Sequence, residues 1–261
     1  MGKIAIPTHN RWNLIQGLTL GYLKDCGVAE EAIDLFVGDE AEAAEYRRVC
    51  RCGIIVTGAT NVRDKFNYIH TWYRAGEHVM VVEDDLKAVE KLAGYNKLVV
   101  HHDLLQDAVK AFNACHHNKT ALWGISSNSN PFFLKDQVSV GFKFIVANLY
   151  GFIQSDPPIT VTQMSKTDYE RTILYYKKYG SVVRLDYLCP ITKNYKTAGG
   201  MSDVQGQRYQ LEEDSVNYLT TTYSDLCTKN ETKKSQFPEM SLRLKRADTV
   251  GRNSQKGWWL E

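Results

Sequence analysis

The sequence has 261 residues, of which 43% are hydrophobic and 24% charged, and its formal net charge is +2. This length and composition are those of an ordinary globular chain, so we expect one large domain, with at most a small appendage. The near-neutral charge excludes an overall bias toward polyanions, and no apolar run is long enough to span a membrane.

The first hundred residues alternate between strand-like and helix-like patterns. Short apolar segments typical of strands lie at 3–9, 32–39, 52–58 and 78–85. The segments between them, at 11–27, 40–49 and 62–76, have apolar residues at helical spacing. Strands separated by helices predict βαβ units and a mainly parallel sheet, so the expected fold class is α/β.

After residue 85 the alternation becomes less regular. We expect a short helical turn at 86–92, helices at 103–118 and 166–180, and strands at 96–102, 121–127, 138–154 and 180–190. The sequence therefore predicts one domain over residues 1–228, with a nucleotide-binding half at 1–102 and a mixed-strand acceptor half at 103–228. Residues 229–261 are expected to form a basic tail, because eight Lys and Arg face three acidic residues between Lys229 and Lys256.

The cysteines and the first residues indicate where such a chain would work. The six cysteines are scattered and include no CxxC pair, so we expect free thiols in a reducing compartment. The opening "MGKIAIPTHNRW" runs directly into a strand pattern without a charged-then-apolar leader. We therefore expect a soluble, cytoplasmic protein, in the host cytoplasm if the chain is viral.

Polar or glycine-containing residues follow each of the first four predicted strands, at 7–11, 38–39, 57–61 and 83–85. In open parallel sheets ligands bind at the carboxyl ends of the strands. We therefore expect these four segments to line one crevice.

Three adjacent carboxylates, Glu83, Asp84 and Asp85, follow the fourth strand. If the strand continued through them, the first and third would point to one side and Asp84 to the other. Adjacent anions repel and are costly to bury without a counter-charge. A bound Mg²⁺ or Mn²⁺ ion would offset this repulsion, with a substrate diphosphate completing the coordination shell of the ion. Capping of a following helix, or exposure to solvent, is the alternative.

Several motifs together resemble a known family. An apolar fourth strand that ends in clustered carboxylates, in a parallel βαβ array whose first strand ends in "IPTHNR", resembles the GT-A glycosyltransferases. The segments that carry a more specific resemblance are "IPTHNR" at 6–11, "FNYI" at 66–69, "EDDL" at 83–86, "WGISSNSNPFF" at 123–133, "TDYERTILYYKKYGSVVR" at 167–184 and "TAGGM" at 197–201. In their order, these segments resemble the phage and viral proteins grouped with the TET/JBP-associated glycosyltransferases, over roughly residues 3–210.

The resemblance implies a metal-dependent glycosyltransferase that moves a sugar from a nucleotide sugar, such as a UDP-sugar, to a hydroxyl acceptor. Mn²⁺ or Mg²⁺ would be held by Asp85 and Glu83, and Asp168, with Glu170 in the same helical turn, would act as the general base. Capping of the helix is the alternative role for both carboxylates. The nucleotide sugar is expected to contact Pro7, Thr8, His9, Arg11, Asp39, Arg63, Asn67, Glu83, Asp84 and Arg184.

The acceptor is expected to contact Trp123, Asn128, Asn130, Phe132, Gly199 and Gly200. Core packing of the aromatic residues and a tight turn at the two glycines are the alternatives. By the resemblance, the acceptor would be a hydroxymethylated pyrimidine in viral or phage DNA, reached in single strands, as free nucleotides or by base flipping. A protein or glycan acceptor, and a non-catalytic module that binds nucleotide or nucleic acid, remain alternatives. The oligomeric state is not predicted.

Two departures from the family pattern affect the site. Phe66 stands where the family has Arg, and Lys65 or Arg63 is expected to supply the positive charge. All seven histidines lie at or before His117, so a late metal-binding histidine is missing. Asp186 or Asp203 is expected to replace it, if the late ligand exists at all.

Overall fold

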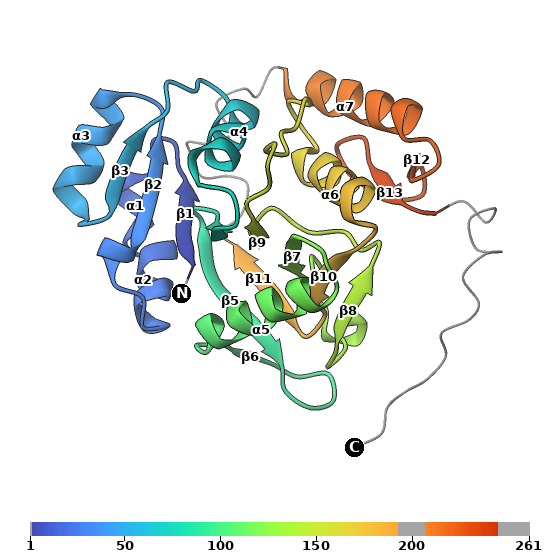
Figure 1. Cartoon of the computed structure of the whole chain (residues 1–261), viewed down its shortest axis with the longest axis horizontal. Helices are drawn as coiled ribbons and strands as arrows, with labels where there is room; N and C mark the ends of the chain where they lie inside the picture. Colours follow the sequence, from blue (N-terminus) through green and yellow to red (C-terminus); the bar gives the residue numbers. More distant parts are fainter. Residues whose placement is uncertain (1, 193–206, 245–261) are drawn as a thin grey trace.

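The computed structural model describes residues 2–192 and 207–244. An eight-stranded sheet forms its centre, in the order β3-β2-β1-β4-β9-β7-β10-β8 (Figure 1). The four strands from the first part of the chain are parallel, and β9 and β8 run antiparallel to their neighbours. The predicted α/β fold with a mainly parallel sheet is confirmed. The strands are β1 (Lys3–Pro7), β2 (Ile33–Val37), β3 (Gly53–Val56), β4 (His78–Val82), β7 (Leu122–Ile125), β8 (Val138–Gly141), β9 (Leu149–Ile153) and β10 (Val182–Leu185).

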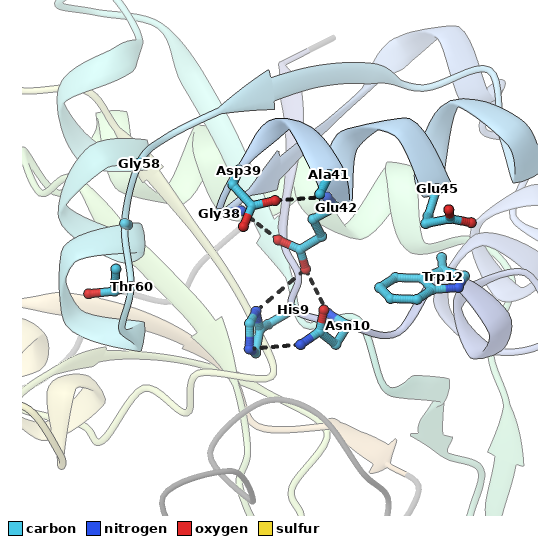
Figure 2. A pocket seen from close by; sticks show the side chains of 11 residues that line it. His9, Asn10, Trp12, Gly38, Asp39, Ala41, Glu42, Glu45, Gly58 and Thr60 are labelled. Atoms are coloured by element: carbon cyan, nitrogen blue, oxygen red, sulfur yellow. Dashed lines mark hydrogen bonds and ion pairs between the residues drawn. The ribbon is translucent and has the colours of Figure 1, made fainter.

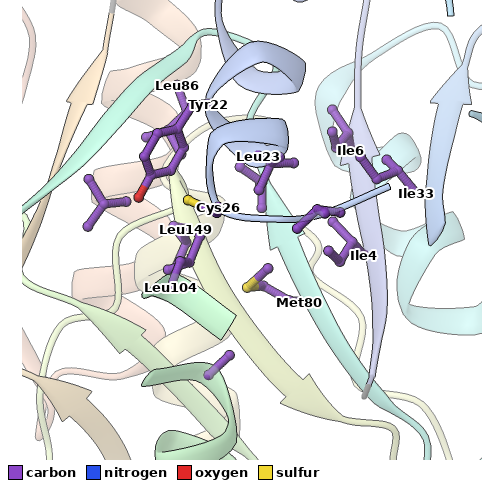
Figure 3. Close-up of a cluster of buried hydrophobic side chains, with 14 of the residues drawn as sticks. Ile4, Ile6, Tyr22, Leu23, Cys26, Ile33, Met80, Leu86, Leu104 and Leu149 are labelled. Atoms are coloured by element: carbon purple, nitrogen blue, oxygen red, sulfur yellow. The ribbon is translucent and has the colours of Figure 1, made fainter. Parts of the chain in front are cut away.

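Helices cover both faces of the sheet because successive strand residues alternate between two cores. On β1, Ile4 and Ile6 belong to one core and Ala5 to the other. The first core includes residues of α2 (Thr19–Asp25), α3 (Glu40–Val49) and α5 (Leu104–His117), and part of it is drawn in Figure 3. The second includes residues of α4 (Val62–Trp72) and α6 (Thr167–Tyr179). Two short helices, α1 (Trp12–Ile15) and η1 (Glu30–Ala32), connect these elements.

The predicted helical turn at 86–92 is wrong, because this segment is strand β5 (Leu86–Leu92). It pairs with β6 (Leu98–Val100) and β11 (Leu188–Thr192) in a separate antiparallel sheet. Leu86 and Ala88 are buried while Lys87 between them is exposed, which is the period of a strand. Seven residues are too few for periodicity to separate the two patterns in sequence.

Two other expected strands are each divided in the structure. Residues 138–154 form β8 and β9, which lie at the edge and in the middle of the main sheet. Residues 180–190 form β10 and the start of β11, which belong to different sheets. A short 3-10 helix, η2 (Pro131–Phe133), precedes β8.

The predicted tail boundary at residue 229 is also wrong. Helix α7 (Arg208–Thr222) is followed by the antiparallel pair β12 (Cys227–Lys229) and β13 (Met240–Leu242). These elements share a small core with Ile173 of α6, at the opposite end of the molecule from α3 (Figure 1). Residues 245–261 of the predicted tail lie outside the described residues. None of the helices described is both long and apolar enough to cross a membrane.

Candidate active site

The loop after β1 is fixed by buried hydrogen bonds. Thr8 is 3% exposed, and its hydroxyl donates to Asp84 Oδ2 at 2.7 Å and bonds the hydroxyl of Tyr46 on α3. The Tyr46 hydroxyl also accepts the backbone N–H of Arg11 at 3.1 Å. The ends of β1 and β4 and helix α3 are therefore joined through two hydroxyl groups.

The three carboxylates after β4 point differently from the prediction. The strand ends at Val82, and Glu83 to Asp85 lie in a turn, so the alternation of a strand no longer applies. Glu83 accepts a hydrogen bond from Asn148, next to β9, whereas Asp84 and Asp85 both contact Arg11 on the β1 side. The expectation that Glu83 and Asp85 share one side is corrected accordingly.

Arg11 is the counter-charge of this turn. Its Nη1 atom forms an ion pair with Asp84 and lies 3.4 Å from Asp85 Oδ2. Burial alone would lower the pKa of Arg11, but the nearby carboxylates keep that pKa raised. Burial, and then the charges of Asp85, Asp84 and Asp168, raise the pKa of Glu83 to about 8. The turn thus holds more negative charge than Arg11 neutralises.

A pocket of about 580 Å³ opens beside this turn, at the carboxyl ends of β1, β2 and β3. Figure 2 shows Asp39 and Glu42 above His9 and Asn10, with Trp12 and Glu45 at one side. The described lining contains three carboxylates but no Lys or Arg, so it favours hydroxyl and N–H donors over phosphate. The lining residues are His9, Asn10, Trp12, Gly38, Asp39, Ala41, Glu42, Glu45, Gly58, Ala59 and Thr60.

Glu42 holds the wall of the pocket together. Its carboxylate accepts the backbone N–H groups of Gly38 and Asn10, each at 2.6 Å, and lies 3.5 Å from His9 Nδ1. Burial alone would raise the pKa of Glu42, but these hydrogen bonds lower it below its usual value. Asp39 caps α3 by accepting the Glu42 N–H at 2.8 Å.

Of the two cations proposed to replace the family arginine, Lys65 reaches the site. Lys65 is 6% exposed, and its ammonium group donates to the carbonyl of Thr8. Burial lowers its pKa, against the charges of the nearby carboxylates. Arg63 instead forms an ion pair with Asp64, with its Nε atom 2.8 Å from Asp64 Oδ1. The Asn67 side-chain amide donates a hydrogen bond to the carbonyl of Val161 and accepts one from its backbone N–H.

The two candidate carboxylates of α6 have different surroundings. Glu170 is 1% exposed, and its oxygens accept the N–H groups of Thr162 and Gln163 and the Thr162 hydroxyl. Glu170 therefore anchors a loop. Asp168 accepts only the N–H of Tyr169 among the described residues, and burial raises its pKa while Arg171 opposes that effect.

Arg171 lies one turn after Asp168 on α6. It is 2% exposed, and its Nε and Nη2 atoms have no hydrogen-bond partner among the described residues. The guanidinium carbon lies 3.7 Å from the ring centroid of Tyr150, a cation–π contact that stabilises the buried charge. The positive charge of Arg171 favours the ionised form of Asp168.

The predicted acceptor residues separate into a buried group and an exposed group. Trp123 is fully buried against Gly151, so its assignment to acceptor binding is corrected to core packing. Phe132 is 69% exposed, and its N–H is held by the side chain of Asn130. Asn128 in turn accepts the N–H of Asn130 at 2.9 Å. Gly199 and Gly200 lie outside the described residues.

Of the two predicted late ligands, only Asp186 lies in the described part of the chain, and both of its oxygens already have protein partners. The Arg184 Nε atom lies 2.6 Å from Asp186, and the remaining Asp186 oxygen accepts from Gln137 and Ser139. These hydrogen bonds lower the pKa of Asp186 although burial alone would raise it. Asp203 lies outside the described residues.

One oxygen of the acidic turn is available to a metal. Asp85 Oδ1 is buried and has no hydrogen-bond partner in the described parts of the chain, and burial raises the pKa of this carboxyl. An orphaned carboxylate oxygen suits a hard divalent cation. No group of three or more His, Cys, Asp or Glu side chains close enough to hold a metal occurs within residues 2–192 and 207–244. The residues therefore fit a divalent metal ion most of whose coordinating oxygens come from a bound diphosphate and from water.

No protein-family model matches the chain, and no curated protein sequence matches it. The solved structures that are similar to this chain include S. aureus TarS 1–349 with UDP-GlcNAc and the mannosyltransferase PcManGT from Pyrobaculum calidifontis with GDP-Man and Mn²⁺. TarS has a TM-score of 0.55 at 12% identity and covers 84% of this chain. PcManGT has a TM-score of 0.56 at 12% identity and covers 85%.

These likenesses establish the architecture. The chain has the fold of the GT-A glycosyltransferases, as the motifs predicted. It spans 66% of the TarS chain and 64% of the PcManGT chain.

Four residues that contact the site were not predicted from the sequence. Glu42, Tyr46 and Asn148 contact the predicted residues from α3 and from the turn before β9. Arg171 lies within the quoted motif "TDYER", and its spacing of three residues from Asp168 on a helix was the available signal.

We expect Glu42→Gln to lower the free energy of unfolding at pH 7 by about 1–2 kcal/mol, because the lost carboxylate accepts two backbone hydrogen bonds and lies 3.5 Å from His9. The pKa of Glu42 is lowered on folding, so its contribution is present at neutral pH and disappears as the pH falls through that lowered pKa. Urea unfolding at pH 7 and at acidic pH measures both values. Glu45→Gln, which removes a more exposed partner of Arg48, is the control and should change little. An equal loss at both pH values would contradict the assignment.

Proposed function

We propose that the chain is a metal-dependent glycosyltransferase that moves a sugar from a nucleotide sugar to a hydroxyl acceptor. The observation that carries the proposal is the pocket at the ends of β1, β2 and β3, next to a turn whose Asp85 has an orphaned oxygen. The GT-A fold supports it, because the similar structures of TarS and PcManGT are complexes with UDP-GlcNAc and with GDP-Man and Mn²⁺, respectively.

The nucleoside occupies the pocket, and the diphosphate lies over the acidic turn. Carboxylates such as Asp39 accept hydrogen bonds from ribose hydroxyls and from base N–H groups, whereas they repel phosphate. Arg11 and Lys65 are the cations at the end of β1. The charges therefore orient a nucleoside diphosphate with its phosphates away from Asp39 and Glu42.

Asp85 would hold Mn²⁺ or Mg²⁺, together with Glu83 if that side chain turns from Asn148 toward the ion, and the ion would neutralise charge on the nucleoside diphosphate leaving group. Asp84 is paired with Arg11 and bonded to Thr8, so its role is to fix the turn.

Asp168 is the proposed general base. Among the described residues, only the Tyr169 N–H donates a hydrogen bond to the Asp168 carboxylate. The carboxylate can therefore accept the proton of the acceptor hydroxyl as the sugar is transferred. Burial raises the pKa of Asp168, which makes its carboxylate a stronger base than that of an exposed aspartate, and the positive charge of Arg171 favours the ionised form.

The proposed acceptor is a hydroxymethylated pyrimidine in viral or phage DNA. The family resemblance implies it, and the exposed ring of Phe132, with that of Phe133 beside it, offers a surface on which a base stacks. A sugar ring can stack on the same aromatic surface, so a glycan acceptor is an alternative, whereas a protein acceptor would need no such stacking and a non-catalytic module would need no base at Asp168.

We expect Asp85→Asn to lower metal-dependent turnover of the nucleotide sugar at least about 100-fold, because the amide is a weaker ligand for a hard cation. Direct titration with Mn²⁺ in the presence of UDP measures metal binding without turnover and should show the same loss. Asp214→Asn, an exposed change on α7, is the matched control. Unchanged Mn²⁺ binding in Asp85→Asn would remove the metal assignment.

Asp168→Asn should lower kcat of transfer about 10²–10⁴-fold and leave nucleotide affinity within about twofold, because a general base acts in the chemical step. The acid limb of the kcat profile in the wild type should lie above the ordinary pKa of an aspartate, since burial raises that pKa. Steady-state kinetics across pH, with UDP affinity measured by calorimetry, test both points. A variant that loses nucleotide affinity as much as rate would identify Asp168 as a binding residue.

The acceptor is tested with a labelled nucleotide sugar and matched single-stranded DNA with and without hydroxymethylated pyrimidines. Label should enter only the hydroxymethylated strand, and Phe132→Ala should raise the KM for that strand several-fold. Label that enters protein or glycan instead would favour the alternative transferase. Nucleotide binding without turnover toward any of these acceptors would favour the non-catalytic module.

A further inference from the structure

Two histidines lie together at the amino end of β4, whereas the acidic turn follows the carboxyl end of that strand. His78 is the first residue of β4, and His116 lies in the last turn of α5. Their Nε2 atoms are 2.8 Å apart, and their ring centroids are 4.9 Å apart. His78 is half-buried and His116 is exposed. The pair is therefore separate from the candidate active site and accessible from solvent.

The position of the His78 ring is fixed by its neighbours. It stacks on Phe112, with the two centroids 4.3 Å apart and the ring planes at 7° to each other. Phe112 and His116 are four residues apart on α5 and so lie on the same face of that helix. A side chain at Gly2 would collide with the backbone of His78, so this glycine lets the two backbones approach closely. The His78 ring is thus held against α5, and the exposed His116 ring can rotate to share a ligand with it.

The distance between the two nitrogens fits one kind of coordination geometry. Imidazole nitrogens lie about 2.0 Å from a bound divalent metal ion. Because the Nε2 atoms of His78 and His116 are 2.8 Å apart, the angle between them at such an ion is about 90°. Neighbouring positions of a square-planar site meet this angle, whereas a tetrahedral site needs the nitrogens about 3.3 Å apart. Square-planar sites with nitrogen and oxygen ligands are typical of Cu²⁺ and Ni²⁺.

The surroundings of the pair favour a metal ion over an additional proton. Burial, and then the proximity of His116, lower the pKa of His78, so its ring is neutral at pH 7. Neutral imidazole is the form of histidine that binds metals. The last turn of α5 adds the negative end of the helix dipole, which stabilises a cation. A hydrogen bond between the two rings, with no metal, is the alternative.

We propose that His78 and His116 together bind one divalent transition-metal ion, Cu²⁺ or Ni²⁺, through their Nε2 atoms. A ring that carries its proton on Nε2 moves that proton to Nδ1, so that both Nε2 lone pairs face the ion. Within residues 2–192 and 207–244 no third His, Cys, Asp or Glu is close enough to join them, so water occupies the remaining positions. The ion links the start of β4 to the end of α5. The inference does not depend on the proposed transferase activity.

The experiment titrates the metal-free, full-length protein with Cu²⁺ at pH 7 and follows binding by calorimetry and electron paramagnetic resonance. We expect one such site per chain, with a tetragonal spectrum and hyperfine coupling to two imidazole nitrogens. His116→Gln should weaken this site at least about tenfold, because an amide is a poorer ligand than imidazole for this ion. His117→Gln, at the next and also exposed position of α5, is the matched control and should bind as the wild type does. Asp85→Asn should keep the site, which separates it from the metal proposed for the active site.

A second measurement follows the stability of the folded chain. Excess Ni²⁺ should raise the midpoint of thermal unfolding in the wild type and in His117→Gln but not in His116→Gln, because an ion held only by the folded state stabilises that state. Unfolding without metal confirms that the variants are folded. Equal Cu²⁺ affinity in the wild type and in His116→Gln would overturn the proposal, and so would a spectrum without two imidazole nitrogens. Either outcome would leave the two rings joined only by a hydrogen bond.

Discussion

The ion pair between Arg11 and Asp84 joins the ends of the two central strands, β1 and β4. Without it, three carboxylates would crowd one turn with no cation beside them, a costly arrangement at partly buried positions. Thr8 and Tyr46 add hydroxyl contacts that lock the same loop to α3. The geometry of the pocket and of the acidic turn depends on this connection, because both begin where β1 ends.

The charges of the site are divided in space. The pocket is lined by carboxylates, whereas Arg11 and Lys65 contact the loop and turn at its border. Further along the chain, Arg171 lies buried one turn after Asp168 on α6. Such a division separates a region suited to hydroxyl and N–H donors from one suited to anions. It follows from which strand or helix carries each side chain, and so from the order of strands in the sheet.

Much of the architecture could be predicted because the first four strands are short, apolar and separated by clear helical patterns. The wrong secondary-structure predictions fall where the local sequence pattern fits both a helix and a strand, or where a strand pairs with a segment distant in sequence. Residues 86–92 form strand β5 and not the predicted helical turn, and their partner β11 lies far away in sequence. Residues 229–244 were predicted to be part of a tail, but they contain β13, which pairs with the nearby β12 and contributes to the small core shared with α7. Trp123 was expected on a surface, yet it packs in the core against Gly151, which leaves room for the ring.

The sequence by itself determined the α/β class, the parallel strands and the positions of Glu83, Asp84, Asp85 and Asp168, because residue type and period are local properties. Only the tertiary structure decided which groups each of these carboxylates contacts. It directed Asp84 to Arg11, Glu83 to Asn148 and Glu170 to a loop, and it left Asp85 Oδ1 without a partner in the described residues. The reason is physical: the protonation and bonding of a carboxylate depend on the donors, charges and water around it, and the fold brings these together from distant parts of the chain.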